Sequence, residues 1–338
     1  MIESRGLTKR YGPTTAVDDL TFTVAPGRVT GFLGPNGSGK STTMRMLLGL
    51  DRPTAGEALS DGKAYRDLRH PLRTVGALLD AKWVHPNRSA RAHLRWMARS
   101  NRLPPGRVDE VLDQVGLTAV AGNRAGSFSL GMSQRLGIAA ALLGDPGVLL
   151  FDEPVNGLDP EGIVWIRGFM RGLAAEGRTV LVSSHLLPEM AVTAAELVVI
   201  GRGRLIAQCT TAAFVEGASR STVRVSAPRE AELAAALGRH GIAVAAADGG
   251  RGLVVTGAEA ASVGEIAAAE GLVLHELSLH RGSLEEAFMH ITGHDVEYSA
   301  VQHSAVQHSA VEHSTVEHSA GGPAGDRDQA PALAAARR

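Results

Sequence analysis

The stretch Gly34-Pro35-Asn36-Gly37-Ser38-Gly39-Lys40-Ser41 decides the fold, because it fits the pattern G-x-x-x-x-G-K-[S/T] in full. A short β-branched run, residues 28–33, precedes it, and residues 41–50 read as a helix. Glycines let a backbone wrap closely around an anion, and the amides at the start of a helix point toward it. The motif therefore predicts a phosphate-binding loop, in which Lys40 supplies a cation for the β- and γ-phosphates and Ser41 ligates Mg²⁺. An ordinary glycine-rich turn is the alternative, and the strand–loop–helix context disfavours it.

Two carboxylates follow a second apolar run, Val148-Leu149-Leu150-Phe151-Asp152-Glu153-Pro154. Four consecutive apolar residues are typical of a strand buried on both faces, and ligands bind at the carboxyl ends of such strands in open α/β sheets. This position suits Asp152 to hold Mg²⁺, directly or through water, and Glu153 to accept a proton from an attacking water. A solvated acidic turn is the alternative.

The rest of the first 215 residues alternates between apolar runs and amphipathic segments. Residues 179–183 and 197–200 are further candidate strands, and residues 108–115, 133–143 and 163–176 are candidate helices. Strand–helix alternation predicts an α/β fold with a largely parallel sheet covered by helices.

Composition excludes several classes of protein. The chain has 338 residues and a formal net charge of −1, which argues against a dedicated nucleic-acid binder. Its single cysteine, Cys209, excludes a disulfide scaffold and a cysteine-based metal cage. No run approaches the roughly 18–20 apolar residues of a membrane span, and the first residues carry no secretion signal. We therefore expect no membrane helix in this chain.

The two motifs and the elements around them resemble the ATP-binding subunit of ATP-binding cassette (ABC) transporters, over roughly residues 2–215. The most specific segment is Ser127-Phe128-Ser129-Leu130-Gly131-Met132-Ser133-Gln134-Arg135, which stands where that family has L-S-G-G-Q. Leu130 replaces the first glycine and Met132 the glutamine, whereas Ser129 and Gly131 are retained. The S-L-G-M form is similar to the bacterial subgroup associated with bacitracin- and daunorubicin-type antibiotic export.

The resemblance implies a P-loop NTPase fold of the ABC ATPase type, with a mixed sheet and a helical subdomain at about residues 82–145. It implies ATP and Mg²⁺ as cofactors, Glu153 as the catalytic base and His185 as a residue that contacts the γ-phosphate. It also implies metal contacts from Ser41, Asp152 and Asp80, although Asp80 stands where the family has a glutamine. The implied nucleotide-binding residues are Tyr11, which stacks on adenine, Gly34, Asn36, Gly37, Gly39, Lys40, Ser41, Thr42, Asp80, Ser129, Gly131 and Asp159.

The same resemblance implies two protein partners and no nucleic acid. ATP is expected to join two copies of the chain head to tail, with Ser129 and Gly131 of one copy facing the phosphate-binding loop of the other. A separate membrane permease is expected to meet residues 82–102, which contain Trp83 and Trp96, so that the chain sits peripherally on the cytoplasmic side of the membrane. Export of a drug or antibiotic is the leading interpretation. Export of lipid or polysaccharide, a soluble ABC ATPase not coupled to transport, and an ATP-binding regulator without turnover are the alternatives.

Three segments are predicted along the chain. Residues 1–218 form the ATP-binding domain, and residues 219–293 form a small α+β accessory domain with the split β-α-β-β-α-β order. Residues 294–338 form a disordered tail that contains four near-copies of a pentapeptide, ending at His303, His308, His313 and His318. A weak metal-binding tract is the alternative for the tail. His275, Glu276 and His280 are expected to be surface residues rather than a metal site.

Overall fold

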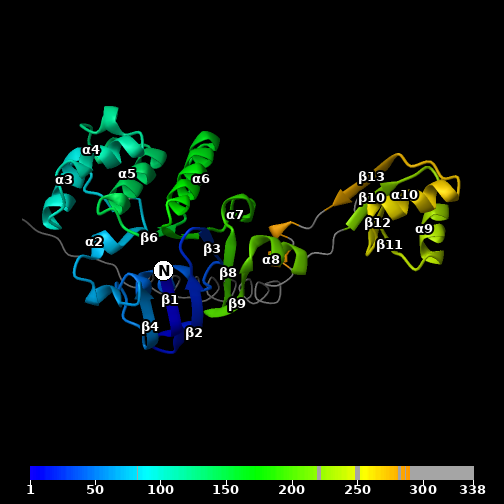
Figure 1. The fold of residues 1–338 in the computed structure, drawn as a ribbon, viewed down its shortest axis with the longest axis horizontal. Coiled ribbons are helices and arrows are strands. Elements are labelled where there is room, and N and C mark those ends of the chain that lie inside the picture. The colour runs from blue at the N-terminus through cyan, green and yellow to red at the C-terminus, as the bar shows by residue number, and fades with distance from the viewer. Residues whose placement is uncertain (82, 219–221, 248–251, 281–282, 286, 290–338) are drawn as a thin grey trace, which may run out of the picture. The chain divides into compact units, whose positions relative to one another are not determined.

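The computed structural model describes residues 1–81, 83–218, 222–247, 252–280, 283–285 and 287–289 (Figure 1). The described residues belong to one unit by their contacts. The predicted tail, with its four histidines and its possible metal tract, lies outside the described residues. We call residues 1–218 the N-terminal part and residues 222–280 the C-terminal block, and describe each by itself.

A six-stranded sheet forms the centre of the N-terminal part, in the order β5-β6-β7-β3-β8-β9. The first five strands run parallel, and β9 pairs with β8 in the antiparallel sense. Because β6, β7 and β3 are neighbours and parallel, their carboxyl ends lie at one edge. The strands are β3 (Val29–Leu33), β5 (Val75–Leu78), β6 (Val148–Asp152), β7 (Thr179–Ser183), β8 (Glu196–Gly201) and β9 (Arg204–Thr210).

The apolar runs read from the sequence are explained by two cores, one on each face of this sheet. In β6, Leu149 and Phe151 pack into one hydrophobic cluster, whereas Val148 and Leu150 pack into the other. Side chains alternate between faces along a strand, so a strand buried on both faces has to be apolar at every position.

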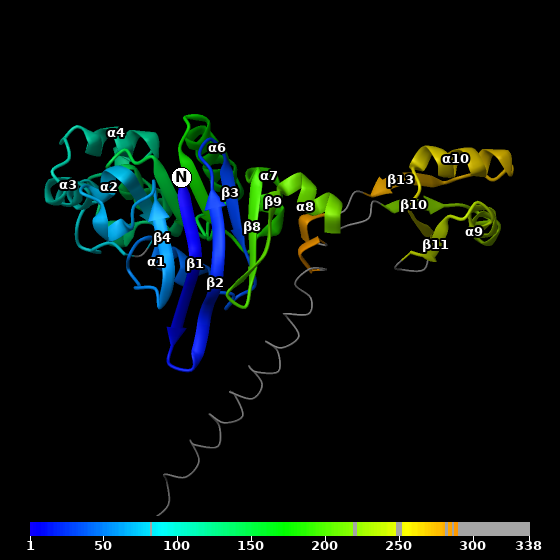
Figure 2. The same ribbon diagram turned by 60° about the horizontal axis from the view of Figure 1, so that its bottom comes forward.

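A three-stranded antiparallel sheet, in the order β2-β1-β4, contributes to the second core. Its long strands β1 and β2 run side by side in both views (Figure 2). Leu7 and Leu20 of this sheet share their cluster with Met44 and Leu47 of α1. The elements are β1 (Ile2–Tyr11), β2 (Thr14–Val24), α1 (Lys40–Leu47) and β4 (Ala55–Ser60).

Helices supply most of the other core. Three of them begin at side-chain caps, since Ser89 accepts a hydrogen bond from the backbone N–H of Ala92, Ser129 accepts one from Met132, and Asp159 accepts one from Gly162. The helices are α2 (Pro71–Thr74), α3 (Ala90–Ser100), α4 (Arg107–Gln114), α5 (Leu130–Leu142), α6 (Pro160–Ala175), α7 (Leu187–Thr193) and α8 (Thr211–Ala218), with short 3₁₀ turns at Tyr65–Asp67, Thr118–Val120 and Ala125–Ser127.

The C-terminal block has its own four-stranded antiparallel sheet, in the order β11-β12-β10-β13. Its cluster of buried residues includes Val223, Val225, Leu233, Val255 and Val263. The order of elements is the split β-α-β-β-α-β arrangement predicted from the sequence. The elements are β10 (Thr222–Ser226), α9 (Glu230–Arg239), β11 (Ala243–Ala246), β12 (Leu253–Thr256), α10 (Ala260–Ala269) and β13 (Glu276–His280).

The chain returns to the core of the N-terminal part after β13. Helical residues follow at 284, 285 and 287–289, and Leu284, Ala287 and Phe288 are buried in the cluster that contains Leu149 and Phe151. The accessory domain predicted from the sequence, residues 219–293, includes this last segment. Its apolar side chains instead pack with those of the larger core, and we propose that the accessory domain is the C-terminal block alone, inserted between α8 and the returning helix.

Two glycines provide a matched test of this packing. An added Cβ at Gly76 of β5 would overlap the carbonyl oxygen of Ala141 in α5, whereas an added Cβ at Gly168 of α6 meets nothing within 4 Å. We expect Gly76→Ala to lower the free energy of unfolding by about 1–3 kcal/mol through overpacking. Gly168→Ala should raise it by about 0.5–1 kcal/mol through helix propensity. Urea denaturation of both variants measures the difference, and equal midpoints would contradict the close approach of β5 and α5.

Candidate functional site

The phosphate-binding loop predicted from the sequence joins β3 to α1. Close backbone approach requires its glycines, because a Cβ at Gly34 would lie 2.5 Å from the carbonyl oxygen of Ile200. Gly39, directly before α1, has a φ of 101°, and a Cβ there would lie 2.5 Å from the carbonyl oxygen of Ala16. The first amides of α1 are thereby held open at the mouth of the loop.

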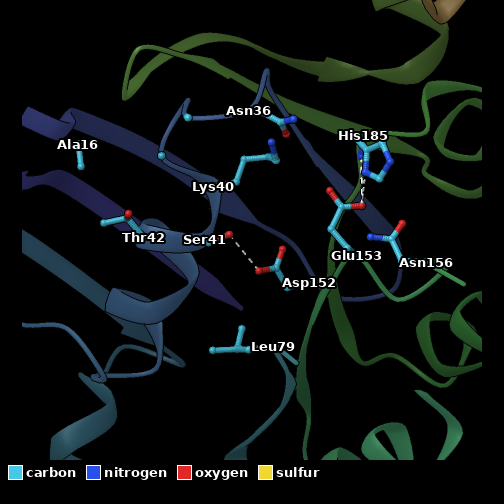
Figure 3. A pocket seen from close by; sticks show the side chains of 12 residues that line it. Ala16, Asn36, Lys40, Ser41, Thr42, Leu79, Asp152, Glu153, Asn156 and His185 are labelled. Carbon is cyan, nitrogen blue, oxygen red and sulfur yellow. Dashed lines mark hydrogen bonds and ion pairs between the residues drawn. The ribbon is translucent and has the colours of Figure 1, made fainter. Parts of the chain in front are cut away.

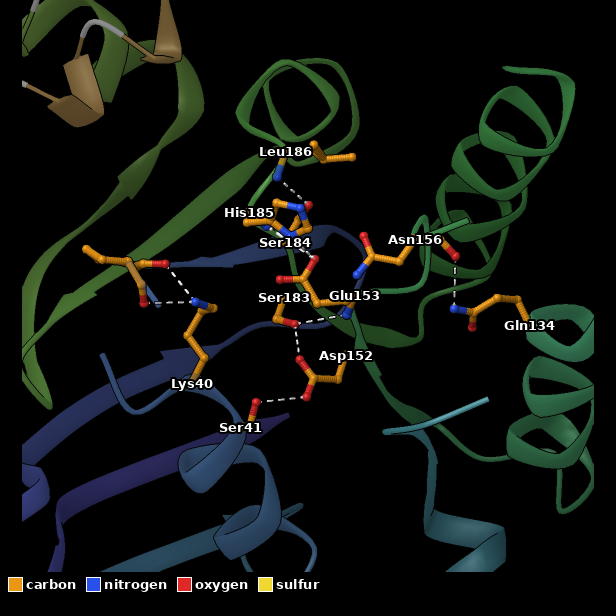
Figure 4. Close-up of polar contacts among 12 residues, drawn as sticks. Lys40, Ser41, Gln134, Asp152, Glu153, Asn156, Ser183, Ser184, His185 and Leu186 are labelled. Atoms are coloured by element: carbon orange, nitrogen blue, oxygen red, sulfur yellow. Dashed lines mark hydrogen bonds and ion pairs between the residues drawn. The ribbon is translucent and has the colours of Figure 1, made fainter. Parts of the chain in front are cut away.

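Lys40 is buried at the start of α1, with an exposed fraction of 8%. Its ammonium donates to the carbonyl oxygens of Gly34 at 2.7 Å and Pro35 at 3.1 Å (Figure 4). Burial lowers the pKa of Lys40, and the carboxylates of Glu153 and Asp152 oppose that shift. The loop therefore holds a cation beside two carboxylates, in position to meet an anion.

Asp152 links three elements at the edge of the sheet. The Ser41 hydroxyl of α1 donates to Asp152 Oδ2 at 3.1 Å, and the Ser183 hydroxyl at the end of β7 donates to Asp152 Oδ1. Carboxylate and hydroxyl oxygens are ligands that Mg²⁺ accepts, and a nucleotide-bound magnesium uses few protein ligands. Ser41 and Asp152 could therefore hold Mg²⁺.

Glu153 follows β6 in a left-handed backbone conformation, with a φ of 50°. Its backbone N–H donates to Ser183 Oγ at 3.1 Å, and its carboxylate oxygen Oε2 lies 2.8 Å from His185 Nδ1 (Figure 4). The backbone N–H of His185 also donates to Oε2, at 3.3 Å. The strand end thus presents a carboxylate, oriented by a histidine, on the same side as Lys40.

These side chains surround one cavity of about 490 Å³ (Figure 3). Nine of its lining residues carry predictions made from the sequence, and they come from the phosphate-binding loop, the strand ends and the segment after β7. The nine are Asn36, Gly37, Gly39, Lys40, Ser41, Thr42, Asp152, Glu153 and His185.

Four residues at this site were not assigned from the sequence. Ala16, Leu79 and Asn156 line the cavity, and Ser183 bonds both Asp152 and the backbone of Glu153. Asn156 is further fixed by its carbonyl oxygen, which accepts a hydrogen bond from Gln134 at 3.3 Å. The sequence contains a clue to Ser183, because this serine ends residues 179–183, a candidate strand of the predicted, largely parallel sheet.

Tyr11 lies outside the lining of this cavity and is 47% exposed. Its hydroxyl donates to Asp51 at 3.0 Å, and Lys9 lies over its ring. Partial burial and the bond to Asp51 raise the pKa of Tyr11.

Asp80 also lies apart from the phosphate-binding loop. It lines a separate groove of about 410 Å³, together with Trp83, Trp96 and the buried His93, while its neighbour Leu79 lines the phosphate cavity. Burial is the main cause that lowers the pKa of His93, and its Nδ1 has no partner among the described residues.

Ser129, Gly131 and Asp159 are absent from the cavity lining of the described chain. Ser129 is exposed at the start of α5, where it caps the helix. Asp159 caps α6, accepting a hydrogen bond from the backbone N–H of Gly162 at 2.8 Å. Within the parts of the chain that the structure covers, no helix has the length and apolarity to cross a membrane.

Comparison with known proteins agrees with this geometry. The family model for the ABC transporter matches residues 17–156, and a domain of unknown function matches residues 221–285. The uncharacterized ABC transporter ATP-binding protein YhcH of Bacillus subtilis is 34% identical, over 88% of this chain and 97% of its own length. The bacitracin transport ATP-binding protein BcrA of Bacillus licheniformis is 41% identical, over 61% of this chain and 68% of its own length.

A solved ATP-binding subunit of an ABC transporter has 27% identity and a TM-score of 0.59, and the match covers 64% of this chain and 92% of that one. The family resemblance, the fold class and the assignment as an ATPase made from the sequence are confirmed. The extent of the match to YhcH, together with the fold, shows that the chain belongs to the family of ABC transporter ATP-binding proteins.

Proposed function

We propose that two copies of this chain hydrolyse MgATP between them and thereby power export through a separate membrane permease. The observation that carries the proposal is the convergence of Lys40, Ser41, Asp152, Glu153 and His185 on one cavity. This set supplies an anion site, metal ligands and a general base, which are the parts that phosphoryl transfer to water needs.

Each residue has a definite task in this proposal. The loop amides and Lys40 bind the β- and γ-phosphates, and Ser41 and Asp152 hold Mg²⁺, which neutralises charge on the phosphate oxygens. A water attacks the γ-phosphorus and gives its proton to Glu153, while the bond between the γ-phosphorus and the bridging oxygen breaks to leave ADP and phosphate. His185, 2.8 Å from Glu153, orients that carboxylate and faces the γ-phosphate.

The proposal involves two copies, and it is supported by the position of Ser129 and Gly131, which do not line the cavity of their own described chain. Ser129 is exposed at the start of α5, where the positive end of the helix dipole suits an anion from another molecule. We therefore place Ser129 and Gly131 of one copy against the γ-phosphate held by the other. Loss of that phosphate on hydrolysis removes the shared contacts, so the pair opens.

The permease is proposed to dock at the groove that contains Asp80, Trp83 and Trp96. The two tryptophans are 62% and 54% exposed, which is unusual for large apolar side chains without a partner. Docking there would hold the chain on the cytoplasmic side of the membrane. It would also connect the permease to the phosphate cavity through the adjacent Leu79 and Asp80.

Export is favoured by the names of relatives. They include bacitracin transport, lantibiotic transport and Nod factor export ATP-binding proteins. We propose a drug or antibiotic as the cargo of this system, with lipid or polysaccharide as the alternative. An ABC ATPase without a permease is the second alternative, and co-purification of a permease from the native membrane separates the two.

Glu153→Gln tests the catalytic base. Because the amide cannot accept a proton, we expect the rate of phosphate release to fall by about 10²–10⁴-fold while MgATP binding is kept. The variant should accumulate as an ATP-bound dimer, visible by size-exclusion chromatography with light scattering. Glu232→Gln, in the C-terminal block, is the control and should hydrolyse ATP normally. A normal rate in Glu153→Gln would exclude Glu153 as the base.

Ser129→Trp tests the contribution of the second copy. In the Glu153→Gln background, the indole should block the interface, so that the protein binds ATP as a monomer. Nucleotide binding to the monomer should be unchanged, because Ser129 does not line its own cavity. Ser262→Trp, on the exposed side of α10, controls for bulk. An ATP-bound dimer that persists in the Ser129→Trp/Glu153→Gln double variant would contradict the head-to-tail arrangement.

A further inference from the structure

We propose that a basic pocket beside α2 and the carboxyl end of α3 binds a phosphate group, at a site separate from the ATP cavity. The pocket has a volume of about 290 Å³ and is lined by residues 69–73 and 100–103. Arg69, His70, Arg73 and Arg102 contribute to the lining, which contains no acidic residue.

Many described arginines pair with a carboxylate, and two arginines of this pocket do not. Arg5, Arg28 and Arg107, for example, each pair with a carboxylate. In the described part of the chain, neither Arg69 nor Arg102 has a side-chain hydrogen bond or an ion pair. Gathering cations without a counter-ion is unfavourable, and a bound anion would remove that cost.

The backbone at Arg102 gives an independent argument. Helix α3 ends in a Schellman motif, in which Leu103 N–H donates to Ala98 O and Arg102 N–H donates to Arg99 O. Arg102 then occupies the left-handed position, with a φ of 53°. Glycine is the residue that this position favours, since a Cβ is strained there.

Five other described helices end in the same motif, and each has glycine at the left-handed position. These glycines are Gly49, Gly116, Gly177, Gly241 and Gly271. Arg102, which borders the basic pocket, takes the place of glycine at the end of α3, and Asp145, with a φ of 56° just after α5, is a second described non-glycine residue in this conformation at a helix end. A strained backbone position beside a pocket supports the hypothesis that the side chain placed there has a function.

The carbonyl groups at the end of α3 explain the position of only one arginine of this cluster. Cations are favoured near a helix carboxyl end, and Arg73 donates to the carbonyl oxygen of Arg102 at 3.4 Å. That contact uses Arg73 alone and leaves Arg69 and Arg102 unpaired.

The donor groups of the pocket suit a phosphate group. Guanidinium groups present paired N–H donors that match two oxygens of a phosphate. The Ser100 hydroxyl lies in the same lining, with no hydrogen bond in the described residues. Leu72 lines both this pocket and the groove with Trp83 and Trp96, so the two are adjacent.

The position of the pocket identifies two sources for the phosphate. If the groove docks a permease, as proposed above, anionic lipid headgroups lie close to the pocket, and this source alone rests on the proposed function. A free phosphate compound is the other source. Both use the same arginines, and the experiment distinguishes them.

Arg69→Gln/Arg102→Gln in the full-length chain removes the two unpaired charges, and Arg5→Gln/Arg239→Gln removes the same charge elsewhere. Co-sedimentation with phosphatidylglycerol vesicles tests the lipid source, with phosphatidylcholine vesicles as the neutral comparison. Titration of inorganic phosphate, with the ATP site filled by Mg-ADP, tests the free source. We expect the pocket variant to bind at least about tenfold more weakly to one probe, given roughly fivefold per basic residue at an anionic surface, and the control to bind like the wild type.

Arg102→Gly adds a readout that a structural role for Arg102 would not give. Glycine relieves the left-handed strain, so this variant should unfold at a higher denaturant concentration while it binds phosphate less tightly. Loss of vesicle binding supports the lipid source, and loss of phosphate binding alone supports the free source. Equal binding of both probes by the wild type and Arg69→Gln/Arg102→Gln, or no binding of either, would overturn the proposal. Hydrolysis of ATP is measured separately in the Glu153 variant and is independent of this result.

Discussion

The parallel pairing of β6, β7 and β3 is the constraint on which the site depends. Because these strands are neighbours and run the same way, the phosphate-binding loop, Asp152 and Ser183 meet at one edge of the sheet. Ser41 and Ser183 then hold Asp152 from two sides, and Glu153 follows it directly. The two hydrophobic cores fix the strands from both faces, so burial of aliphatic side chains far from the chemistry sets its geometry.

The sequence predicts the features that depend on local patterns. The loop at residues 34–41 and the carboxylates after residue 151 are recognisable because their chemistry requires particular residues at fixed spacing, and continuous apolar runs identify buried parallel strands. The split order of the C-terminal block follows from alternation in the same way. Nine residues predicted to act at the site line one cavity for this reason.

Long-range packing explains what the sequence did not predict. The prediction for Asp80 stays a prediction, since the structure places Asp80 in the lining of the groove with Trp83, whereas Leu79 lines both that groove and the phosphate cavity. The separate antiparallel sheet depends on pairing between strands as distant as β1 and β4. The last helix looked continuous with the C-terminal block, and only its burial against the larger core reveals where it belongs.

The helical residues after β13 complete the core of the N-terminal part. The C-terminal block interrupts a core that is completed by Leu284, Ala287 and Phe288, so it is an insert with two attachment points rather than an appendage with one. Truncation after α8 would leave a hole in the remaining protein. Exchange of the block for another domain would therefore have to keep Leu284, Ala287 and Phe288 to fill the larger core.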